Sequence, residues 1–259
     1  MAGSTPVRPS VSTPVADVVT DSVPPRTWGT IGPMTSPRPV ALLDLDGTLM
    51  DSASGIVASV RAAYERVGLP VPSEAVMRSF AGPPLGWSLA THGVPAELLD
   101  DAAAAYADHF GRVGVWDTRV FDGIPQALTA LREAGALLVV ATAKPQRWAA
   151  PICDETGLTP LLDHLVGAPD DESESKGQII GRALAWVREA TGDAGFRAVM
   201  LGDREHDVHG AAEHGLPCLG AGWGYADGDE LREAGAVEVL TSTSQVPAAV
   251  LARLTDGAA

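Results

Sequence analysis

The sequence is poor in cysteine, lysine and aromatic residues. Its 259 residues include two cysteines, Cys153 and Cys218, and two lysines, Lys144 and Lys176, while aromatic residues make up 5%. Two cysteines cannot build a disulfide framework or a four-ligand zinc site, and we expect no structural disulfide between them. The longest strongly apolar stretch, near 134–143, is far shorter than the ~20 residues that a membrane span requires. The composition therefore argues against a disulfide scaffold, a structural zinc protein and a membrane-spanning protein.

Basic residues are scarce relative to acidic ones. The chain has 18 lysine and arginine residues against 33 aspartate and glutamate residues, which gives a formal net charge of −15. An acidic protein repels phosphate backbones and anionic lipid, so neither nucleic acid nor a membrane surface is expected as a main partner. The N-terminus lacks a basic start followed by an apolar core, so we expect no secretory signal. The prediction is a cytoplasmic protein, monomeric or homodimeric.

Proline content and strand–helix alternation divide the chain into parts. Residues 1–39 are rich in Pro, Ser and Thr and predict a disordered tail, unless Met34 is the true start. Residues 40–51 and 121–259 alternate apolar runs with helical segments, which is typical of a Rossmann-like, doubly wound parallel α/β sheet. The apolar runs expected to form strands begin at Val40 and recur at 137–142, 165–168, 198–202, 218–220 and 237–240.

Residues 52–120 break this alternation and contain no convincing strand. Helical patterns lie at 53–67, 73–79, 84–91 and 95–112. We therefore predict an all-helical cap, residues 52–120, inserted after the first strand of the core.

The run Asp44-Leu45-Asp46-Gly47 carries the clearest chemical signal. Residues two apart in a strand point the same way, so the two aspartates should sit together at the carboxyl end of the first strand. Ligands bind at that end in open α/β sheets. Two adjacent carboxylates repel each other unless a cation is present, and oxygen ligands favour Mg²⁺. Gly47 would let backbone N–H groups approach an anion such as phosphate. A structural alternative for the two acids is that one caps a helix and the other lies in a turn.

Three later segments fit the same site. Thr142 ends a predicted strand with a hydroxyl, Lys176 begins a predicted helix, and Asp203 and Asp207 follow another apolar run. Taken alone, each has an ordinary structural explanation: a strand-ending threonine, a solvated loop lysine, and acids that favour a helix N-terminus. Both lysines of this arginine-rich chain fall near predicted strand ends, which suggests that compact point charges are needed there.

In this order the motifs resemble the haloacid dehalogenase (HAD) superfamily, in its phosphoglycolate phosphatase and 5′-nucleotidase-like branch. They are Asp-x-Asp-Gly-Thr-Leu, a strand-terminal Thr, an isolated Lys and Gly-Asp-x-x-x-Asp, and the resemblance runs from about 40 to 240. The helical interval after the first motif resembles the subclass I cap. The chain is also similar to a member of the superfamily that is described as a tyrosine kinase.

The resemblance implies a nucleophile, an acid/base and a magnesium ion. Asp44 would attack phosphorus and form an aspartyl-phosphate, and Asp46 would protonate the leaving alcohol and then deprotonate water. Mg²⁺ would be held by Asp44, the backbone carbonyl of Asp46, and Asp203, with Asp207 supporting the metal site.

The same resemblance assigns substrate contacts. Thr142 and Lys176 would hold the transferring phosphoryl oxygens. In the cap, Gly82 lies in a Gly- and Pro-rich segment, 80–87, that would dip toward the site. Arg78 could meet a carboxylate or second phosphate, or be a surface arginine, and Trp87 could stack on substrate or lie in the core.

The function predicted from the sequence is hydrolysis of a small phosphorylated metabolite. Phosphoglycolate, a nucleoside monophosphate and a sugar phosphate all remain open, as does mutase chemistry. Asp46 disfavours a dehalogenase, which needs no acid for a halide. The alternative is a signalling protein that acts on partner proteins, as a phosphotransferase or a regulatory binding module.

Overall fold

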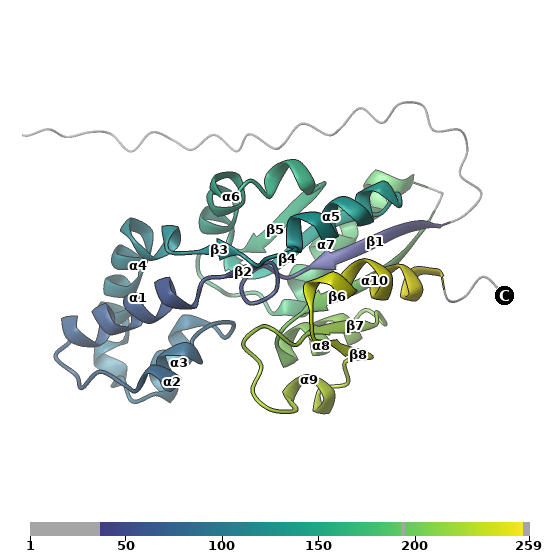
Figure 1. The fold of residues 1–259 in the computed structure, drawn as a ribbon. Helices are drawn as coiled ribbons and strands as arrows, with labels where there is room; N and C mark the ends of the chain where they lie inside the picture. The colour runs from purple at the N-terminus through teal and green to yellow at the C-terminus, as the bar shows by residue number, and fades with distance from the viewer. Residues whose placement is uncertain (1–36, 193–194, 256–259) are drawn as a thin grey trace, which may run out of the picture.

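The centre of the molecule is a six-stranded sheet. A computed structural model describes residues 37–192 and 195–255. Every neighbouring pair of strands is parallel, in the order β5–β4–β1–β6–β7–β8. The strands are β1 (Arg38–Leu43), β4 (Leu137–Pro145), β5 (His164–Ala168), β6 (Phe196–Gly202), β7 (Cys218–Ala221) and β8 (Glu238–Leu240). This topology confirms the predicted doubly wound α/β fold (Figure 1).

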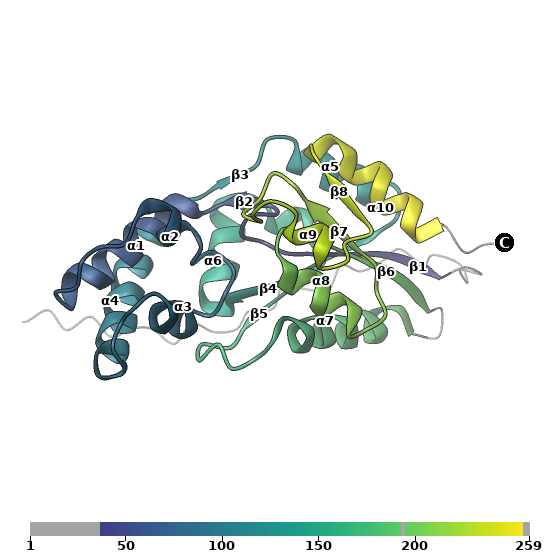
Figure 2. The ribbon, with the colours of Figure 1, turned by 90° about the horizontal axis from the view of Figure 1, so that it is seen from below.

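Helices cover both faces of the sheet (Figure 2). On one face lie α5 (Ile124–Glu133), α6 (Gln146–Glu155) and α10 (Val246–Thr255), and on the other lie α7 (Lys176–Thr191), α8 (Glu205–Ala212) and α9 (Glu230–Glu233). Successive β1 side chains alternate between the two cores, with Ala41 packed on one side and Leu42 on the other. Burial on both faces explains why the strands read as continuous apolar runs. The two cysteines are free and buried, as expected.

A helical segment projects from the carboxyl edge of the sheet. We call it the helical insertion, residues 53–116. It consists of α1 (Ala53–Arg66), α2 (Glu74–Arg78), α3 (Leu85–Thr91), α4 (Leu99–Arg112) and the short 3₁₀ turns η1 (Ala96–Leu98) and η2 (Gly114–Trp116). Figure 1 shows it at the end toward which the arrow of β1 points. The insertion therefore lies over the edge where ligands bind in this class of sheet.

Two short strands connect the insertion to the core. β2 (Met50–Asp51) pairs antiparallel with β3 (Arg119–Val120). The expectation of no strand between 52 and 120 was therefore wrong at β3. Two residues are too few to give an alternating pattern, and the pairing exists only because the chain leaves and re-enters the core at neighbouring points.

Two other boundaries differ from the sequence prediction. The predicted tail, 1–39, lies outside the described residues as far as 36, but Arg38 and Pro39 belong to β1 and pair with Phe196 and Arg197. A proline is compatible with the start of a strand. β4 continues past the predicted end at Thr142, through a register shift, to Pro145.

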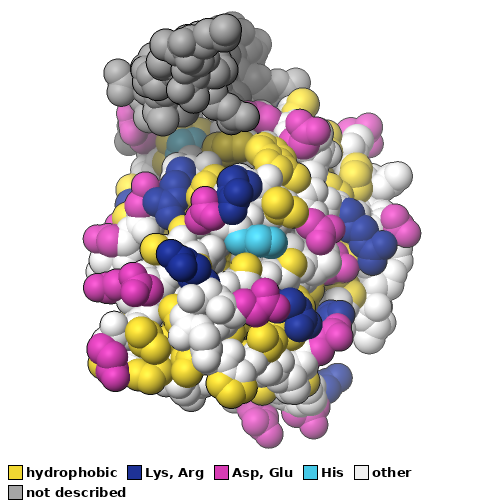
Figure 3. Space-filling model, turned by 90° about the vertical axis from the view of Figure 1, so that its left-hand side faces the viewer, with side chains coloured by type: hydrophobic (Ala, Val, Ile, Leu, Met, Phe, Trp, Pro, Cys, Tyr) yellow, Lys and Arg dark blue, Asp and Glu magenta, His cyan; other side chains and the backbone are white. Residues whose placement is uncertain are grey.

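The outer face of the insertion carries charges of both signs. Figure 3 views the molecule from this end and shows acidic and basic side chains interspersed with apolar ones. The net negative charge is thus not gathered on this face. Within the described residues, no helix has the length and apolar character needed to cross a bilayer.

Gly55 tests the packing of the insertion. A Cβ at this buried position in α1 would lie 2.0 Å from the backbone carbonyl oxygen of Gly114, which cannot rotate away. We expect Gly55→Ala to destabilise the protein by about 1–3 kcal/mol, the usual cost of overpacking. Thermal unfolding and the rate of proteolysis within the insertion measure the effect.

Gly86→Ala is the matched control, because a Cβ there meets no atom within 4 Å and the residue lies inside α3. Its melting temperature should be unchanged or slightly raised, since alanine favours helix over glycine. Equal melting temperatures for Gly55→Ala and the unmodified protein would contradict this account of the packing.

Candidate active site

The first acidic residue of the site follows β1 directly. Asp44 is buried, and its backbone N–H donates to the carbonyl of Leu201 in β6 at 2.9 Å. Leu45 turns into the core, and its carbonyl accepts hydrogen bonds from the N–H groups of Thr48, Leu49 and Met50. The alternation predicted for this segment therefore holds, with polar Asp44 at the edge and apolar Leu45 inside.

Asp203 follows β6, the neighbour of β1, and is fully buried. Its Oδ1 accepts a hydrogen bond from the hydroxyl of Thr48 at 3.1 Å, and its Oδ2 accepts one from the N–H of Tyr225 at 2.8 Å. Donors from two separate loops thus fix the carboxylate. Thr48 follows β1 and Tyr225 follows β7, and these strands are the two neighbours of β6, so both loops reach Asp203 at its end.

Gly47 shapes the turn against Asp203. Its φ is +79°, and a Cβ there would lie 2.1 Å from Oδ2 of Asp203. The N–H of Gly47 donates to the carbonyl of Met50 at 2.7 Å. The N–H of Gly47 therefore closes the turn and does not make the predicted contact with phosphate. A glycine is needed here because φ is positive and there is no space for a Cβ.

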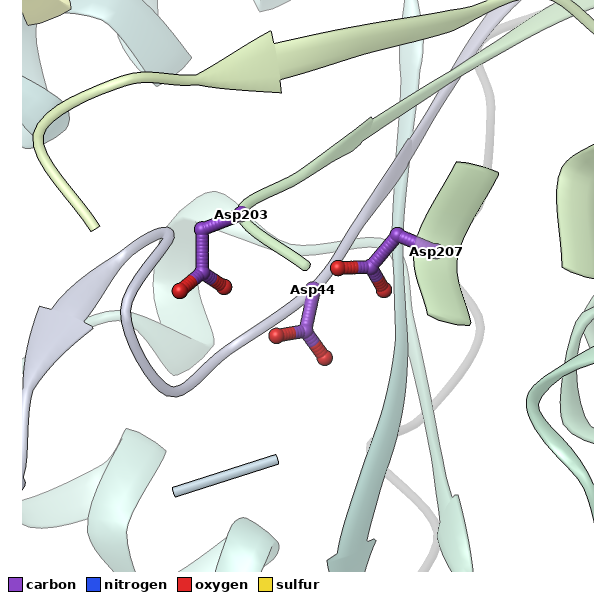
Figure 4. Close-up of side chains that lie close together, drawn as sticks. All are labelled: Asp44, Asp203 and Asp207. Carbon is purple, nitrogen blue, oxygen red and sulfur yellow. The ribbon is translucent and has the colours of Figure 1, made fainter. Parts of the chain in front are cut away.

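Asp44, Asp203 and Asp207 form a cluster of three buried carboxylates. One oxygen from each lies within 4.8 Å of the others, and Figure 4 shows the three carboxyl groups side by side. Asp207 lies in the first turn of α8, and its Oδ2 accepts from the N–H of Arg204 at 3.1 Å. Asp207, predicted only to support a metal site, is thus a full member of the cluster.

Lys176 neutralises part of this cluster. It is the first residue of α7, whose start is fixed by a capping box between Ser175 and Gln178. Its Nζ lies 2.5 Å from Oδ1 of Asp44 and 2.7 Å from Oδ1 of Asp207. Burial lowers the pKa of Lys176, but the carboxylates of Asp207 and Asp44 raise it to a net value above its ordinary one. The ammonium therefore stays charged.

The acidic residues remain short of positive charge. Burial, with help from Asp207 and Asp46, raises the pKa of Asp44 to about 6 despite the opposing effect of Lys176. Burial and the charges of Asp44 and Asp207 raise the pKa of Asp203 well above its ordinary value. Among the described residues, one ammonium contacts this cluster of three acids. Clustered carboxylate oxygens with too little countercharge fit a hard divalent cation.

Asp46 lies outside that cluster and has its own cation, which the sequence reasoning did not place in the site. Its Oδ2 is 2.9 Å from Nζ of Lys144, and its Oδ1 accepts from the hydroxyl of Ser52 at 2.5 Å. The position of Lys144 near a strand end was noted, but the residue was given no partner because β4 was expected to stop at Thr142.

Thr142 contributes a hydroxyl to the same edge of the sheet. Its Oγ1 accepts a hydrogen bond from the N–H of Lys144 at 3.2 Å. A hydroxyl that accepts through oxygen still has its hydrogen to donate. The hydroxyl of Thr142 can therefore donate a hydrogen bond to an anion bound at this edge.

A cavity joins these residues to the helical insertion. From the core it is lined by Asp44, Asp46, Thr142, Lys144, Lys176 and Asp207, and from the insertion by Ile56, Phe80, Gly82, Pro83, Pro84, Leu85, Tyr106, Ala107 and Phe110. Arg204 donates to the carbonyl of Ala81 at 2.6 Å, and the N–H of Leu85 donates to Glu172 at 2.7 Å. Two core side chains thus hold the loop 80–85 over the cavity.

Of the three residues predicted for substrate specificity, only Gly82 lines this cavity. Arg78 forms an exposed ion pair with Glu74 at 3.0 Å, one helical turn away. Trp87 is 59% exposed, so it neither stacks in the cavity nor belongs to the core. The next two residues of α3, Ser88 and Leu89, are the buried ones, which turns Trp87 toward solvent.

Comparisons with known proteins agree with the geometry. The haloacid dehalogenase-like hydrolase family matches residues 39–215. The tyrosine-protein kinase PtkA of Mycobacterium tuberculosis is 39% identical over 198 residues, which are 76% of this chain and 66% of PtkA. The 5′-nucleotidase of Pseudomonas aeruginosa is 36% identical over 195 residues, which are 75% of this chain and 87% of the nucleotidase.

The solved structures include a similar protein, a predicted phosphatase from Clostridium acetobutylicum. It superposes with a TM-score of 0.74 and 32% identity, over 84% of this chain and all of that one. The resemblance drawn from the motifs is thereby confirmed. The chain belongs to the haloacid dehalogenase-like hydrolase family.

Proposed function

We propose that this protein is a divalent-metal-dependent phosphomonoesterase that acts on a small phosphorylated metabolite. The observation that carries the proposal is the meeting of Asp44, Asp203 and Asp207 with Lys176 at the carboxyl edge of the sheet. Asp46 lies beside them in the same cavity. Together these groups supply a nucleophile, a metal site, a proton carrier and a phosphate-binding cation.

The metal site would use Asp44 and Asp203, with the third position taken by Asp207 or by the backbone carbonyl of Asp46. All are oxygen donors, which suits Mg²⁺. The bound ion would offset the repulsion between an anionic nucleophile and an anionic substrate. Asp203 is held in place without it, by Thr48 and Tyr225.

The first step forms an aspartyl-phosphate on Asp44. A carboxylate oxygen of Asp44 forms a bond to phosphorus while the bond from phosphorus to the ester oxygen breaks. Asp46 gives its proton to that oxygen, so the alcohol leaves neutral and Asp46 becomes a carboxylate. Lys176 and Thr142 would donate to the phosphoryl oxygens and stabilise their charge during transfer.

The second step releases phosphate. Asp46, now a carboxylate, takes a proton from a water molecule whose oxygen forms a bond to phosphorus. The bond between phosphorus and Asp44 breaks, and the carboxylate of Asp44 is restored. Asp46 ends the cycle protonated and ready for the next ester.

The helical insertion supports a small substrate. Its loop 80–85 is fastened over the cavity by Arg204 and Glu172, and its side chains on the cavity are mainly apolar or aromatic. A covered cavity admits a metabolite more readily than a folded protein surface. The relative named 5′-nucleotidase fits this class of substrate.

The proposal predicts hydrolysis of at least one small phosphate ester. Phosphate release should be measured over a panel of phosphoglycolate, nucleoside monophosphates and sugar phosphates, with Mg²⁺ and with EDTA. Turnover should require Mg²⁺, and Asp44→Asn should lower it at least about 1,000-fold because the nucleophile is lost. Circular dichroism checks that the variant is folded, and undiminished turnover by folded Asp44→Asn would contradict the assignment.

The same panel tests the protein-directed alternative. The relative PtkA is named a tyrosine-protein kinase, and the match spans less than two thirds of its length. An absence of ester hydrolysis, together with labelling of a protein by ATP carrying a radioactive γ-phosphate, would favour a phosphotransferase. Turnover of a small ester without such labelling favours the proposal made here.

Metal binding gives a second prediction, which does not depend on turnover. Mg²⁺ added to EDTA-treated protein should raise the melting temperature, because the ion binds the folded cluster and not the unfolded chain. A concentration 100-fold above the dissociation constant stabilises by about 2.7 kcal/mol. For a chain of this size that corresponds to a shift of roughly 5–11 °C.

Asp203→Asn should abolish most of this shift, since it removes a buried carboxylate of the cluster. Asp229→Asn is the control, because Asp229 forms an exposed pair with Arg232 outside the site. The control should shift as the unmodified protein does. Equal shifts in all three proteins would place the metal elsewhere.

A further inference from the structure

Lys144 is a buried lysine that the mechanism above does not use. Its side chain is 5% exposed, and its Nζ lies 2.9 Å from Oδ2 of Asp46. Burying an ammonium is costly unless it is paired. The chain has one other lysine, Lys176, and sixteen arginines. Composition alone would therefore favour an arginine at this position.

An aromatic ring from the helical insertion also lies close to this ammonium. The centroid of the Phe110 ring, on α4, lies 4.7 Å from Nζ of Lys144. Phe110 is itself held between Tyr106, at a centroid distance of 5.6 Å, and Trp148 of α6, at 5.9 Å. The electron-rich ring face attracts the cation and keeps water from that side. Lys144 thus contacts both the carboxylate of Asp46 and an aromatic cluster formed by the insertion and α6.

The backbone beneath Lys144 is also fixed. Its N–H donates to Oγ1 of Thr142, and a Cβ at Gly167 in β5 would lie 2.8 Å from its carbonyl oxygen. The register shift between β4 and β5 falls between Thr142 and Pro145, so it includes Lys144. Shifts of this kind re-aim a side chain at the edge of a sheet. Here the side chain is directed to Asp46.

We propose that Lys144 is the positioning residue for Asp46, holding its carboxylate and stabilising the charge it gains on donating its proton to the leaving alcohol. This inference rests on the proposed function. In the first step the O–H bond of Asp46 breaks, its proton moves to the ester oxygen, and the new carboxylate faces Nζ of Lys144. Lys144 keeps its own three protons throughout. The hydroxyl of Ser52 holds the second oxygen of the same carboxylate.

The role predicts a dependence on the leaving group. An alkoxide leaves poorly without a proton, so an alkyl phosphate needs Asp46 as an acid, whereas p-nitrophenolate is stable enough to leave without one. A group that acts only through Asp46 must therefore matter more for alkyl esters. A group that binds the phosphoryl oxygens must matter equally for both.

The experiment compares Lys144→Met with the unmodified protein on an alkyl phosphate and on p-nitrophenyl phosphate. We expect kcat/KM, which reports the first step and not the hydrolysis that both esters share, to fall about 100-fold or more for the alkyl ester and less than about tenfold for the aryl ester. Asp46→Asn should show the same pattern. The double variant should be no slower than Asp46→Asn alone, because the two residues act as one unit.

Arg147→Met is the matched control. Arg147 lines the same cavity and lies over the ring of Trp148, but it pairs with Asp170 at 2.9 Å rather than with Asp46. Its loss should change the rates for both esters by the same factor. Lys144→Gln, which keeps a polar group at the position, serves as a second variant if Lys144→Met does not fold.

Two results would overturn the inference about Lys144 and leave the proposed function standing: an equal fall in kcat/KM for both esters in Lys144→Met, or additive losses in the double variant. Absence of turnover by the unmodified protein would instead contradict the proposed function, and this inference with it.

Discussion

Three buried carboxylates share one ammonium where β1 and β6 end, and much of the local structure serves to keep them there. Asp44, Asp203 and Asp207 repel one another, and burial raises the pKa of the first two. Lys176 offsets part of that repulsion from the first residue of α7. A fold would not retain such a cluster for stability alone, because unpaired buried charge is destabilising. The cluster is therefore suited to hold a further cation.

The sheet topology explains how residues distant in sequence reach this point. The strand order reverses between β1 and β6, so the loops after both strands open onto one edge. The turn after β1 must then pass against Asp203, which leaves no room for a Cβ at Gly47 or at Gly224. The two glycines leave space for the Asp203 side chain. The hydroxyl of Thr48 and the N–H of Tyr225 hold its carboxylate without a metal ion.

Sequence alone predicted the sheet and the four acidic positions because each follows an apolar run whose period and length are unambiguous. It singled out Lys144 but did not pair it with Asp46, because the end of β4 depends on a register shift with β5, a contact between segments that no local pattern records. It could not show that the N–H of Gly47 is bonded to Met50, because a free N–H cannot be told from one that closes a turn in a sequence. For Arg78 the surface alternative is confirmed, whereas neither alternative for Trp87 holds, because short helices carry too few residues for their buried face to be read.

Asp46 is the point where the two parts of the molecule meet. One of its oxygens is held by Ser52, which directly precedes α1, and the other by Lys144, whose ammonium rests on Phe110 of α4. Asp44, the proposed nucleophile, pairs with Lys176 of the core. Chemistry at phosphorus and proton transfer to the leaving group therefore depend on different surroundings. The surroundings of Asp44 are built into the sheet edge, while those of Asp46 include Ser52 at the start of the insertion and, through Lys144, the ring of Phe110 within it.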